Sequence, residues 1–508
     1  MRIRADTWPQ PRNPDWLPSP PRLCMLSARR LQENRHDFCR ARDSPYKLGP
    51  MIGLHCRFPL ADPFSICSMS NQQQRVVITG LGVVGPLGRD LDSFWDNLKA
   101  ETSGISELDC LPLESLPVRF GGQAKCFTGD IGDFGPLEKS LQRSIKKNQK
   151  VMCREIEMGV AACQLALHHA GLGDPTAREP DRFGIVYGSD YIITRPEEYA
   201  DGVAACLNDA KTFDATQWPT VGRPKVNPLW LLKYLPNMPA SHVAIYNDLR
   251  GPSNSVTIRE ASSGASIVEA VAAIRRGAAD VMLAGATGSR MEPLRALHFI
   301  ASEPLAKQTP NPAEMSRPYD ITRNGALIGE GAGAVVLESM DRAVARGAKI
   351  WGEIVAGASS AVGSIRSQRD NIRIAVGNVT RALVQRSLDA GVDLGPGRWH
   401  FHGCGKSEVA GDASEAAGIR DGIGDRDVPV TAAKSYFGNL GAGSGAIEIV
   451  ASCLALDRDQ LFPVLNTRTL DPKCPIRLAR ASDAPGDAFA HVAYSAQGQA
   501  CGVLVRRV

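Results

Sequence analysis

The sequence predicts an α/β protein of two similar halves that together form a five-layer αβαβα sandwich. A strand, a glycine-rich turn and an amphipathic helix at residues 254–276 recur at residues 428–456. In addition, the apolar strand at residues 351–359 corresponds to the strand that begins at residue 75. Because one layer of strands and helices cannot bury both of its faces alone, we expect the halves to pack together around one shared site.

The composition is ordinary for a soluble globular protein and argues against several classes of partner. Of the 508 residues, 43% are hydrophobic and 22% are charged, and the net charge is only +4, so neither nucleic acid nor a membrane surface is expected as a partner. No apolar run approaches the roughly 18 residues of a membrane span. The thirteen cysteines show neither a CxxC pair nor a metal-site spacing, which favours reduced thiols, no bound metal and a cytoplasmic location.

Residues 1–68 differ from the rest of the chain because they are rich in arginine and proline and lack sustained periodicity. The prolines would break the amphipathic helix of a transit peptide, and no compact apolar core precedes a secretion cleavage site. We interpret this segment as a disordered leader or as an over-extended start, with Met69 as the natural first residue. The two halves are expected to span residues 75–340 and 350–508.

The first half opens with RVVITGLGVVGPLG, which predicts a strand from Arg75 followed by a glycine-rich turn and then a helix that closes on Gly104. The letters GLGVVG match a dinucleotide-binding pattern, but no acidic residue ends a second strand about 20 residues later, so we do not favour that interpretation. Residues 155–170 predict an amphipathic helix and residues 183–190 a strand. The region from there to Val226 has the least pattern.

The segment at residues 254–289 organises the first half. It predicts, in order, a strand, a tight turn of small residues, a helix and a buried strand, with the strands at 255–258 and 281–286 and the turn at 261–264. The helix is indicated by Ile267, Val271 and Ile274, whose spacing lines one helical face. Such a strand-to-helix turn suits a nucleophile, because small neighbours expose its side chain and the helix N-terminus stabilises an anion.

Two motifs resemble those of the β-ketoacyl-acyl carrier protein synthases, in particular the elongating synthases of type II. The letters EASSG at 260–264 are similar to the family's nucleophile turn, A-C-[ST]-S-G. The segment at 316–332 is similar to its signature SRP-[FW]-D-x-x-R-[DN]-G-x-x-x-GEGA. The resemblance covers residues 75–508 and implies the thiolase-like fold and an acyltransferase, a 3-oxoacyl-acyl carrier protein synthase, of fatty acid or polyketide biosynthesis.

The resemblance also implies the partners and the chemistry. The acyl carrier protein would be a partner, because its phosphopantetheine carries the substrate, and no other cofactor is implied. A dimer is implied too, either a homodimer or a heterodimer with an active ketoacyl synthase. The family's reaction needs a cysteine that holds the acyl chain, two donors for the enolate left when malonyl loses carbon dioxide, and an oxyanion hole.

Matching the nucleophile turn places Ala261 where the family carries its cysteine. An alanine methyl cannot form a thioester, so the expected fold and the expected chemistry diverge at this residue. Ser262 follows directly, but its side chain is expected to point elsewhere and its hydroxyl is a poor nucleophile without a base. We therefore expect Ser262 and Ser263 to cap the following helix.

The segment WHFHGCGKSEVAGDASEA resembles the family motif N-A-H-G-T-x-T-x-x-G-D-x-x-E-A. This match gives His402 the role of the histidine that stabilises the enolate. The two threonines that contact phosphopantetheine are replaced by Cys404 and Lys406, in a loop that is two residues longer. Carrier binding at this loop is therefore in question, and Cys404 becomes a candidate for a relocated thiol.

The segment KSYFGNLGAGSGA resembles K-S-x-x-G-H-x-x-x-A-[AS]-G, with Lys434 in place and Asn439 where the elongating synthases carry histidine. Asparagine can still donate one hydrogen bond to an enolate oxygen. Two alternatives remain: Asn439 serves only the glycine turn, and Lys434 has a structural role as the partner of Glu415. In the C-terminal loop, Ala496 stands where the family has its gating phenylalanine.

These substitutions favour a non-condensing homologue that resembles the chain length factors, which pair with an active synthase and shape its acyl tunnel. A first alternative is a malonyl-acyl carrier protein decarboxylase, which would use His402 and Asn439 and needs no thioester to the protein. A second is an active 3-oxoacyl-acyl carrier protein synthase whose displaced nucleophile is Cys404 or Ser262. A third is a module that only binds acylated carrier protein.

Overall fold

The structure is a computed structural model, and it describes residues 74–508 with the exception of 113, 115, 175–177 and 364–366. The predicted leader at residues 1–68 therefore lies outside the described residues. Within the described part of the chain, no helix combines the length and the apolarity needed to cross a membrane.

Five strands form what we call the N-terminal strand set. They lie in the order β1-β7-β6-β4-β5, in which the first two neighbouring pairs are antiparallel and the last two are parallel. The strands predicted from the sequence at 183–190, 255–258 and 281–286 all belong to it. Its members are β1 (Val76–Val84), β4 (Phe183–Ser189), β5 (Ser253–Val256), β6 (Val281–Ser289) and β7 (Glu330–Ser339).

Five further strands form the C-terminal strand set and repeat the same arrangement. They lie in the order β8-β13-β12-β9-β10, again with two antiparallel pairs followed by two parallel pairs. Pairing of β1 with β8 joins both sets, and β11 (Arg477–Leu478) extends the sheet to eleven strands. The members are β8 (Gly352–Ala361), β9 (Trp399–His402), β10 (Pro429–Thr431), β12 (Ala488–Tyr494) and β13 (Gln499–Arg506).

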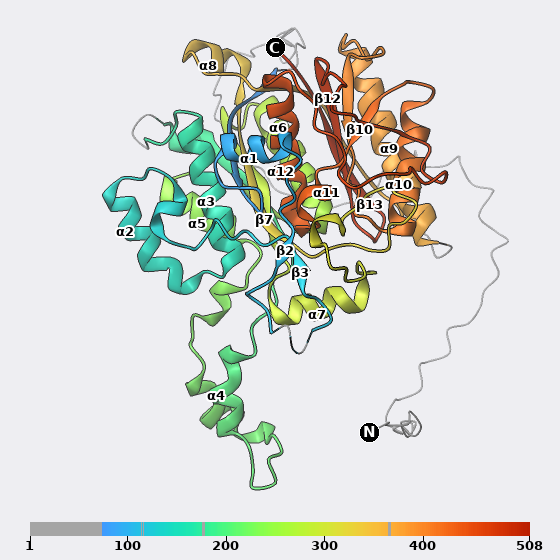
Figure 1. Cartoon of the computed structure of the whole chain (residues 1–508). Coiled ribbons are helices and arrows are strands. Elements are labelled where there is room, and N and C mark those ends of the chain that lie inside the picture. Colours follow the sequence, from blue (N-terminus) through green and yellow to red (C-terminus); the bar gives the residue numbers. More distant parts are fainter. Residues whose placement is uncertain (1–73, 113, 115, 175–177, 364–366) are drawn as a thin grey trace, which may run out of the picture. The chain divides into compact units, whose positions relative to one another are not determined.

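The helices can be grouped by the strand set that they contact (Figure 1). Two helices contact strands of both sets, α6 (Ser262–Arg275) and α12 (Ser444–Asp457). Helices α3 (Arg154–His169) and α5 (Met238–Asn247) pack on the N-terminal strand set, whereas α9 (Gln368–Asp389) packs on the C-terminal strand set and carries α10 (Val409–Ile423). The remaining helices are α1 (Leu91–Lys99), α2 (Lys139–Asn148), α4 (Glu197–Ala205), α7 (Pro293–Ser302), α8 (Met340–Ala345) and α11 (Lys434–Phe437). A short pair, β2 (Ser106–Glu107) and β3 (Phe120–Gly121), lies outside the large sheet.

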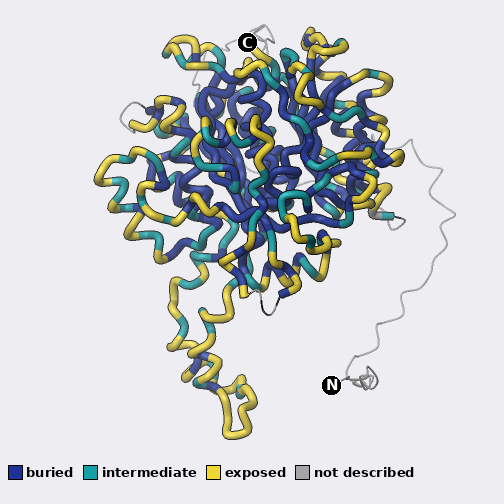
Figure 2. Tube along the Cα trace, in the orientation of Figure 1, coloured by how far each residue is buried: buried dark blue, intermediate teal, exposed yellow. Residues whose placement is uncertain are grey.

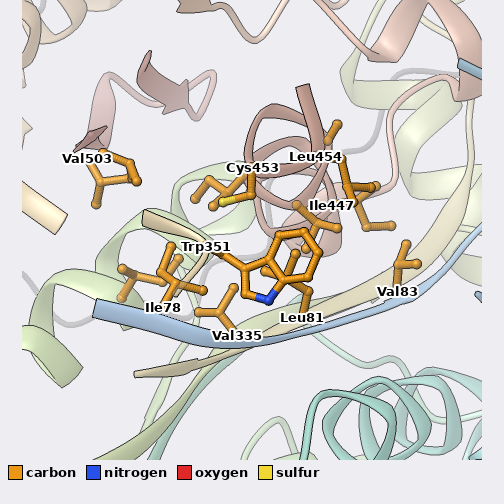
Figure 3. Close-up of a cluster of buried hydrophobic side chains, with 14 of the residues drawn as sticks. Ile78, Leu81, Val83, Val335, Trp351, Ile447, Cys453, Leu454 and Val503 are labelled. Atoms are coloured by element: carbon orange, nitrogen blue, oxygen red, sulfur yellow. The ribbon is translucent and has the colours of Figure 1, made fainter. Parts of the chain in front are cut away.

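The largest apolar core lies between α12 and the central strands. Figure 3 shows Ile78 and Leu81 of β1 close to Val335 of β7, with Ile447 and Leu454 of α12 above them. All five side chains are buried. The apolar stripes predicted for α6 and α12 thus point into this core, which fixes the N-terminal ends of both helices beside each other.

The prediction for the first glycine-rich segment was wrong in one respect. Gly80 and Gly82 lie inside β1 instead of in a turn that follows it. A Cβ atom at Gly82 would lie only 2.1 Å from the carbonyl oxygen of Ala162, so these glycines allow α3 to approach the strand closely. The dinucleotide-binding pattern is excluded for the same reason, because the glycines do not form a strand-to-helix turn. The following helix, α1, ends at Lys99, earlier than predicted.

Candidate active site

The chain passes from β5 to α6 through a turn at Arg259–Ala261, whose last two residues are buried. Arg259 has a φ of 53°, the left-handed region that side-chain-bearing residues seldom adopt, and this conformation turns the chain sharply before the helix. The next two residues, Glu260 and Ala261, are both 0% exposed. A charged side chain is therefore buried at the N-terminus of α6.

The two serines of the turn do not cap the helix, so this prediction was wrong. Both lie within α6 and use their hydroxyls elsewhere. Ser262 Oγ accepts a hydrogen bond from the backbone amide of Ile258 at 2.9 Å, and Ser263 Oγ donates to the carbonyl of Ala442. The first contact closes the turn and the second ties α6 to the loop before α12. Among the described residues, neither hydroxyl forms a hydrogen bond to a base that would make it a nucleophile.

The carboxylate of Glu260 is the centre of the site. Its Oε1 accepts a hydrogen bond from Asn439 Nδ2 at 2.8 Å and another from Arg290 Nη2 at 2.9 Å. Lys406 Nζ lies 3.4 Å from the same oxygen. All three partners are buried, and two of them come from the C-terminal half of the chain. The carboxylate therefore bridges the two halves.

The charges in this cluster are balanced by one another. Burial alone would raise the pKa of the Glu260 carboxyl, but the charges of Lys406 and Arg290 outweigh it and hold this pKa well below its ordinary value. Burial opposes the charge of each cation as well, but the carboxylate of Glu260 together with other acidic groups, among them Glu303, outweighs that effect and raises the pKa of both cations. Glu260 is thus a carboxylate at neutral pH, because its neighbours stabilise only the ionised form.

The ion pairs continue from this centre toward the surface. Arg290 also lies 3.9 Å from a carboxylate oxygen of Glu303, and Glu303 accepts a hydrogen bond from Arg259 Nη1 at 3.1 Å. The side chain of Arg259 is 19% exposed, so it marks the outer end of the series. Cations and carboxylates therefore alternate from the partly exposed Arg259 to the fully buried Lys406.

Residue 261 was expected to face the site, but the structure places the side chain of Glu260 there. The side chain that reaches Asn439 and Lys406 belongs to Glu260, one residue earlier, whereas Ala261 contributes only a buried methyl group. Sequence reasoning also missed Arg290. One signal was available: the charged residue Glu260 directly precedes the small residues of the predicted turn at 261–264, and a charge that becomes buried needs partners.

His402 lies in a separate hydrogen-bonded chain next to α12. Its Nε2 accepts the backbone amide of Ala433 at 3.2 Å, and its Nδ1 lies 2.8 Å from Ser452 Oγ. Because Nε2 is an acceptor here, the proton of the neutral ring is on Nδ1. His400 Nε2 lies 3.1 Å from the same serine hydroxyl. Burial holds the pKa of His402 well below its ordinary value, so the ring is neutral and both of its nitrogens are engaged.

One alternative predicted an ion pair between Lys434 and Glu415, and the structure contradicts it. The ammonium group of Lys434 contacts Glu448 of α12, and His491 Nε2 lies 2.8 Å from the other oxygen of this carboxylate. All three side chains are fully buried. Glu415 instead accepts the backbone amides of the loop at Cys404 and Gly405. Both carboxylates were visible in the sequence, but only the register of α12 determines which of them meets the lysine.

The predicted carrier-binding residues have different surroundings. Cys404 is fully buried, and burial raises the pKa of its thiol. Lys406 Nζ lies over the ring of Tyr494 at 4.7 Å from its centroid, in addition to its contact with Glu260. Ala496 is partly buried in the turn between β12 and β13. The structure therefore brings Lys406 and Asn439 to Glu260. His402 and Lys434 instead contact residues of α12, which are Ser452 and Glu448 respectively.

Replacement of Glu408 by glutamine is expected to stabilise the protein increasingly as the pH rises. Burial raises the pKa of the Glu408 carboxyl; Lys406 opposes this shift, and the carboxylate of Glu303 adds to it. A raised carboxyl pKa means that stability is fully present below the ordinary value of 4.5 and is lost as the pH rises through the folded-state pKa. Near neutral pH, the free energy of unfolding of Glu408→Gln, measured by urea titration, should be about 1–2 kcal/mol higher than that of the native protein.

The control for this experiment is Glu179→Gln, since Glu179 is exposed. Its free energy of unfolding should follow that of the native protein at every pH. Equal pH profiles for Glu408→Gln and the native protein would contradict a protonated, buried Glu408.

The fold and the site together define a class of protein. Two repeats of one strand pattern enclose a buried helix N-terminus, and donors from the second repeat meet a side chain of the first. This is the arrangement of the ketosynthases, α/β proteins with the thiolase-like fold.

The comparisons with known proteins place the chain within that class. Residues 73–343 match the family model "Beta-ketoacyl synthase, N-terminal domain", and residues 375–468 match "Beta-ketoacyl synthase, C-terminal domain". The first match alone covers more than half of the chain. The chain belongs to the beta-ketoacyl synthase family, whose members act in fatty acid and polyketide synthesis.

Individual relatives agree with this assignment. The 3-oxoacyl-[acyl-carrier-protein] synthase 2 of Synechocystis is 29% identical over 409 residues, which cover 80% of this chain and 91% of the relative. The crystal structure of a beta-ketoacyl synthase from Burkholderia phymatum matches with a TM-score of 0.71 and 26% identity, over 86% of this chain and 100% of that one. The ishigamide ketosynthase/chain length factor matches with a TM-score of 0.68 and 24% identity, over 86% of this chain and 100% of that one, which shows the fold.

Proposed function

We propose that this protein is a non-condensing member of its family that pairs with an active ketoacyl synthase, as a chain length factor does. The observation that carries this proposal is the Glu260 carboxylate, which is bound by Asn439, Arg290 and Lys406. We assign to Glu260, instead of Ala261, the place of the family's acyl-accepting cysteine. Neither residue is a cysteine. The prediction that this protein does not catalyse condensation is therefore kept, but the residue at the cysteine's position becomes Glu260.

A carboxylate in this position does not replace the thiol. Condensation passes through a thioester, and a carboxylate would give an anhydride, which water hydrolyses readily. Glu260 is in addition a weak nucleophile, because Lys406 and Arg290 hold its pKa well below the ordinary value. The same cluster argues against free access of a carrier arm, because the charged side chain of Lys406 stands where the family has a threonine that contacts phosphopantetheine.

The decarboxylase alternative is less well supported. Decarboxylation of malonyl leaves an enolate that needs free hydrogen-bond donors. Asn439 Nδ2 already donates to Glu260, and His402 Nε2 is an acceptor for the amide of Ala433. Both groups assigned to this role are therefore occupied. An active synthase with a displaced thiol is also disfavoured, because Cys404 is fully buried and its thiol pKa is raised.

The fold supports the proposal in a second way. We infer that the two strand sets are the sheet layers of the predicted five-layer sandwich, with α6 and α12 between them. In such an arrangement a protein without catalytic activity can keep its apolar core, because residue 260 is not among the side chains that pack around α12. A protein that serves as a partner needs this scaffold and not the thiol.

Co-expression with cysteine-bearing synthases from the same genome tests the proposal. Affinity purification followed by native mass spectrometry should recover a complex of this chain with one synthase. The product length of that synthase should change when this chain is left out. The protein alone should form no 3-oxoacyl product, since loss of the nucleophile costs on the order of a million-fold in turnover.

Two outcomes would contradict the proposal. Failure to recover any synthase would exclude the pairing. Release of carbon dioxide from malonyl-acyl carrier protein by the lone chain, abolished in His402→Ala, would establish the decarboxylase instead. Release that persists in both His402→Ala and Asn439→Ala would point to a contaminating enzyme and leave the pairing result to decide.

A further inference from the structure

A cavity lies beside the helices that pack on the N-terminal strand set. It is bordered by α2, by the C-terminal end of α3 and by α5, which contacts both of the other helices (Figure 1). The outer side of α2 is exposed, whereas most of α3 is buried (Figure 2). The cavity has a volume of about 600 Å³, within the range of roughly 300–1,000 Å³ that small-molecule sites have. A small organic molecule can therefore fit between these helices.

The cavity is separate from the site around Glu260, although α3 reaches both. Glu155 in the first turn of this helix accepts the backbone amide of Asp190 at 3.0 Å, and Asp190 lies 3.8 Å from Arg290, which also binds Glu260. His168 lines the cavity in the last turn of the same helix. Glu155 and His168 are about 20 Å apart along the helix axis, at about 1.5 Å per residue. A molecule in the cavity therefore does not contact Glu260.

Gln164 is a polar residue that the fold buries without satisfying its amide nitrogen. It lies one turn before His168 on α3, lines the cavity and is only 4% exposed. Its Nε2 has no hydrogen-bond partner within the part of the chain that the structure describes. An amide nitrogen buried in this way costs free energy until an acceptor reaches it. A ligand in the cavity with an acceptor atom can supply the missing hydrogen bond.

The apolar sides of the cavity come from α2 and α5. Leu137, Leu141 and Ile145 are spaced by four residues and so follow one side of α2 and the turn before it. Ile145 is fully buried in the core, whereas Leu137 and Leu141 are only partly buried and line the cavity. Two residues of α5 line it too, the buried Tyr246 and the 71% exposed Ile245. An apolar group among these side chains would remove exposed apolar surface from water.

The charged side chains at the cavity are acidic. Glu138 and Asp174 line it, and both are exposed; His168 is the other titratable residue of the lining. Among the described residues that line the cavity none is a lysine or an arginine, and the basic Lys139 and Arg143 of α2 are not part of the lining. A carboxylate or phosphate on a ligand would therefore meet acidic groups, whereas an ammonium group would be attracted by them.

We propose that this cavity is a binding site for a small amphipathic amine. Its ligand has an apolar body that packs on Leu137, Leu141 and Tyr246. A carbonyl oxygen of the ligand accepts a hydrogen bond from Gln164 Nε2, and its ammonium group faces Glu138 at the rim. The assignment rests on the cavity alone and not on the proposed pairing with a synthase.

Isothermal titration calorimetry of the full chain with two matched probes tests the ligand class. L-tryptophanamide carries an indole ring, a carbonyl group and, at mildly acidic pH, a positively charged amine. N-acetyl-L-tryptophan has the same ring and a carbonyl group but carries a carboxylate. The native chain should bind L-tryptophanamide at one site and at least fivefold more tightly than N-acetyl-L-tryptophan.

Two substitutions test whether the probe occupies this cavity. Gln164→Leu should weaken binding of L-tryptophanamide at least tenfold and should raise the unfolding temperature of the unliganded protein, because an unsatisfied polar group is removed. Gly173→Phe should abolish binding by filling the cavity. Gly173 lines the cavity, and the nearest neighbour of a Cβ atom there is the Cα atom of His168 at 3.9 Å, so the new side chain has room.

Matched controls separate these effects from general ones. Gly363 is exposed and a Cβ atom there meets nothing within 4 Å, so Gly363→Phe should bind the probe as the native chain does. Glu138→Gln should reduce the preference for L-tryptophanamide over N-acetyl-L-tryptophan about threefold, whereas Glu101→Gln, which removes an exposed charge outside the cavity, should leave it unchanged. Circular dichroism should show that all variants are folded.

Three results would overturn the inference. The first is a native chain that binds neither probe. The second is equal or tighter binding of N-acetyl-L-tryptophan, which would contradict the assigned charge. The third is native-like binding of L-tryptophanamide by both Gln164→Leu and Gly173→Phe, which would place the probe elsewhere on the protein. Recovery of a synthase by co-purification is a separate measurement, so failure of one proposal does not imply failure of the other.

Discussion

Replacement of Glu260 by alanine is expected to lower the free energy of unfolding by about 3–5 kcal/mol, the largest effect on stability that we predict for a single substitution. The change removes the carboxylate that Arg290 contacts at 2.9 Å and Lys406 at 3.4 Å. Both cations are buried, so water cannot replace the lost partner. Urea unfolding followed by tryptophan fluorescence gives the difference.

Two companion variants show whether the loss is electrostatic. Glu260→Ala/Lys406→Met should regain part of the stability, because one of the two uncompensated charges is removed with little change in apolar volume. Glu269→Ala lies on the same helix in a partly exposed position and should change the free energy of unfolding by less than about 0.5 kcal/mol. Native-like stability of Glu260→Ala would show that its carboxylate does not hold this cluster together.

A cysteine introduced at position 260 is expected to react at least tenfold faster with iodoacetamide at neutral pH than a cysteine introduced at position 261. In Glu260→Cys the thiol replaces a carboxylate beside Lys406 and Arg290 at the N-terminus of α6, and all three features lower a thiol pKa. Residues 259–261 form a 3-10 turn, in which consecutive residues point about 120° apart, so the thiol of Ala261→Cys should lie away from these cations.

Peptide mapping by mass spectrometry separates the introduced cysteine from the natural ones, and the exposed Cys110 and Cys126 provide internal references. The alkylation rate should rise at a lower pH for Glu260→Cys than for Ala261→Cys. Faster reaction of Ala261→Cys would return the nucleophile position to residue 261. Either outcome leaves the native chain without a thiol at this turn.

Much of the fold could be predicted from local patterns. The segment from β5 to β6 was predicted in the right order, and Ile267, Val271 and Ile274 are buried on the face that their spacing indicated. Periodicity of this kind depends only on near neighbours in the sequence. The glycines of β1 were misread because their reason is a helix far along the chain: Gly82 leaves room for the carbonyl of Ala162.

The site could be predicted only in part, and for a similar reason. The absence of a cysteine from the turn was visible in the letters of residues 260–264, whereas the choice between Glu260 and Ala261 depends on which side chain the left-handed conformation of Arg259 turns inward. Motif matching aligned the turn one residue away from the charge that the site contains. The partner of Lys434 was open in the same way, and the register of α12 selects Glu448.

The sequence by itself indicated the family and the order of strands and helices, and it shows that the turn at residues 260–264 contains no cysteine. Only the tertiary structure decided that a glutamate fills the site and that His402 is engaged elsewhere. The reason is physical: Glu260 and Asn439 are separated by 179 residues, and their hydrogen bond forms only after both halves have packed. Short-range periodicity fixes helices and strands, but the partners of a buried charge are supplied by the packing of distant segments.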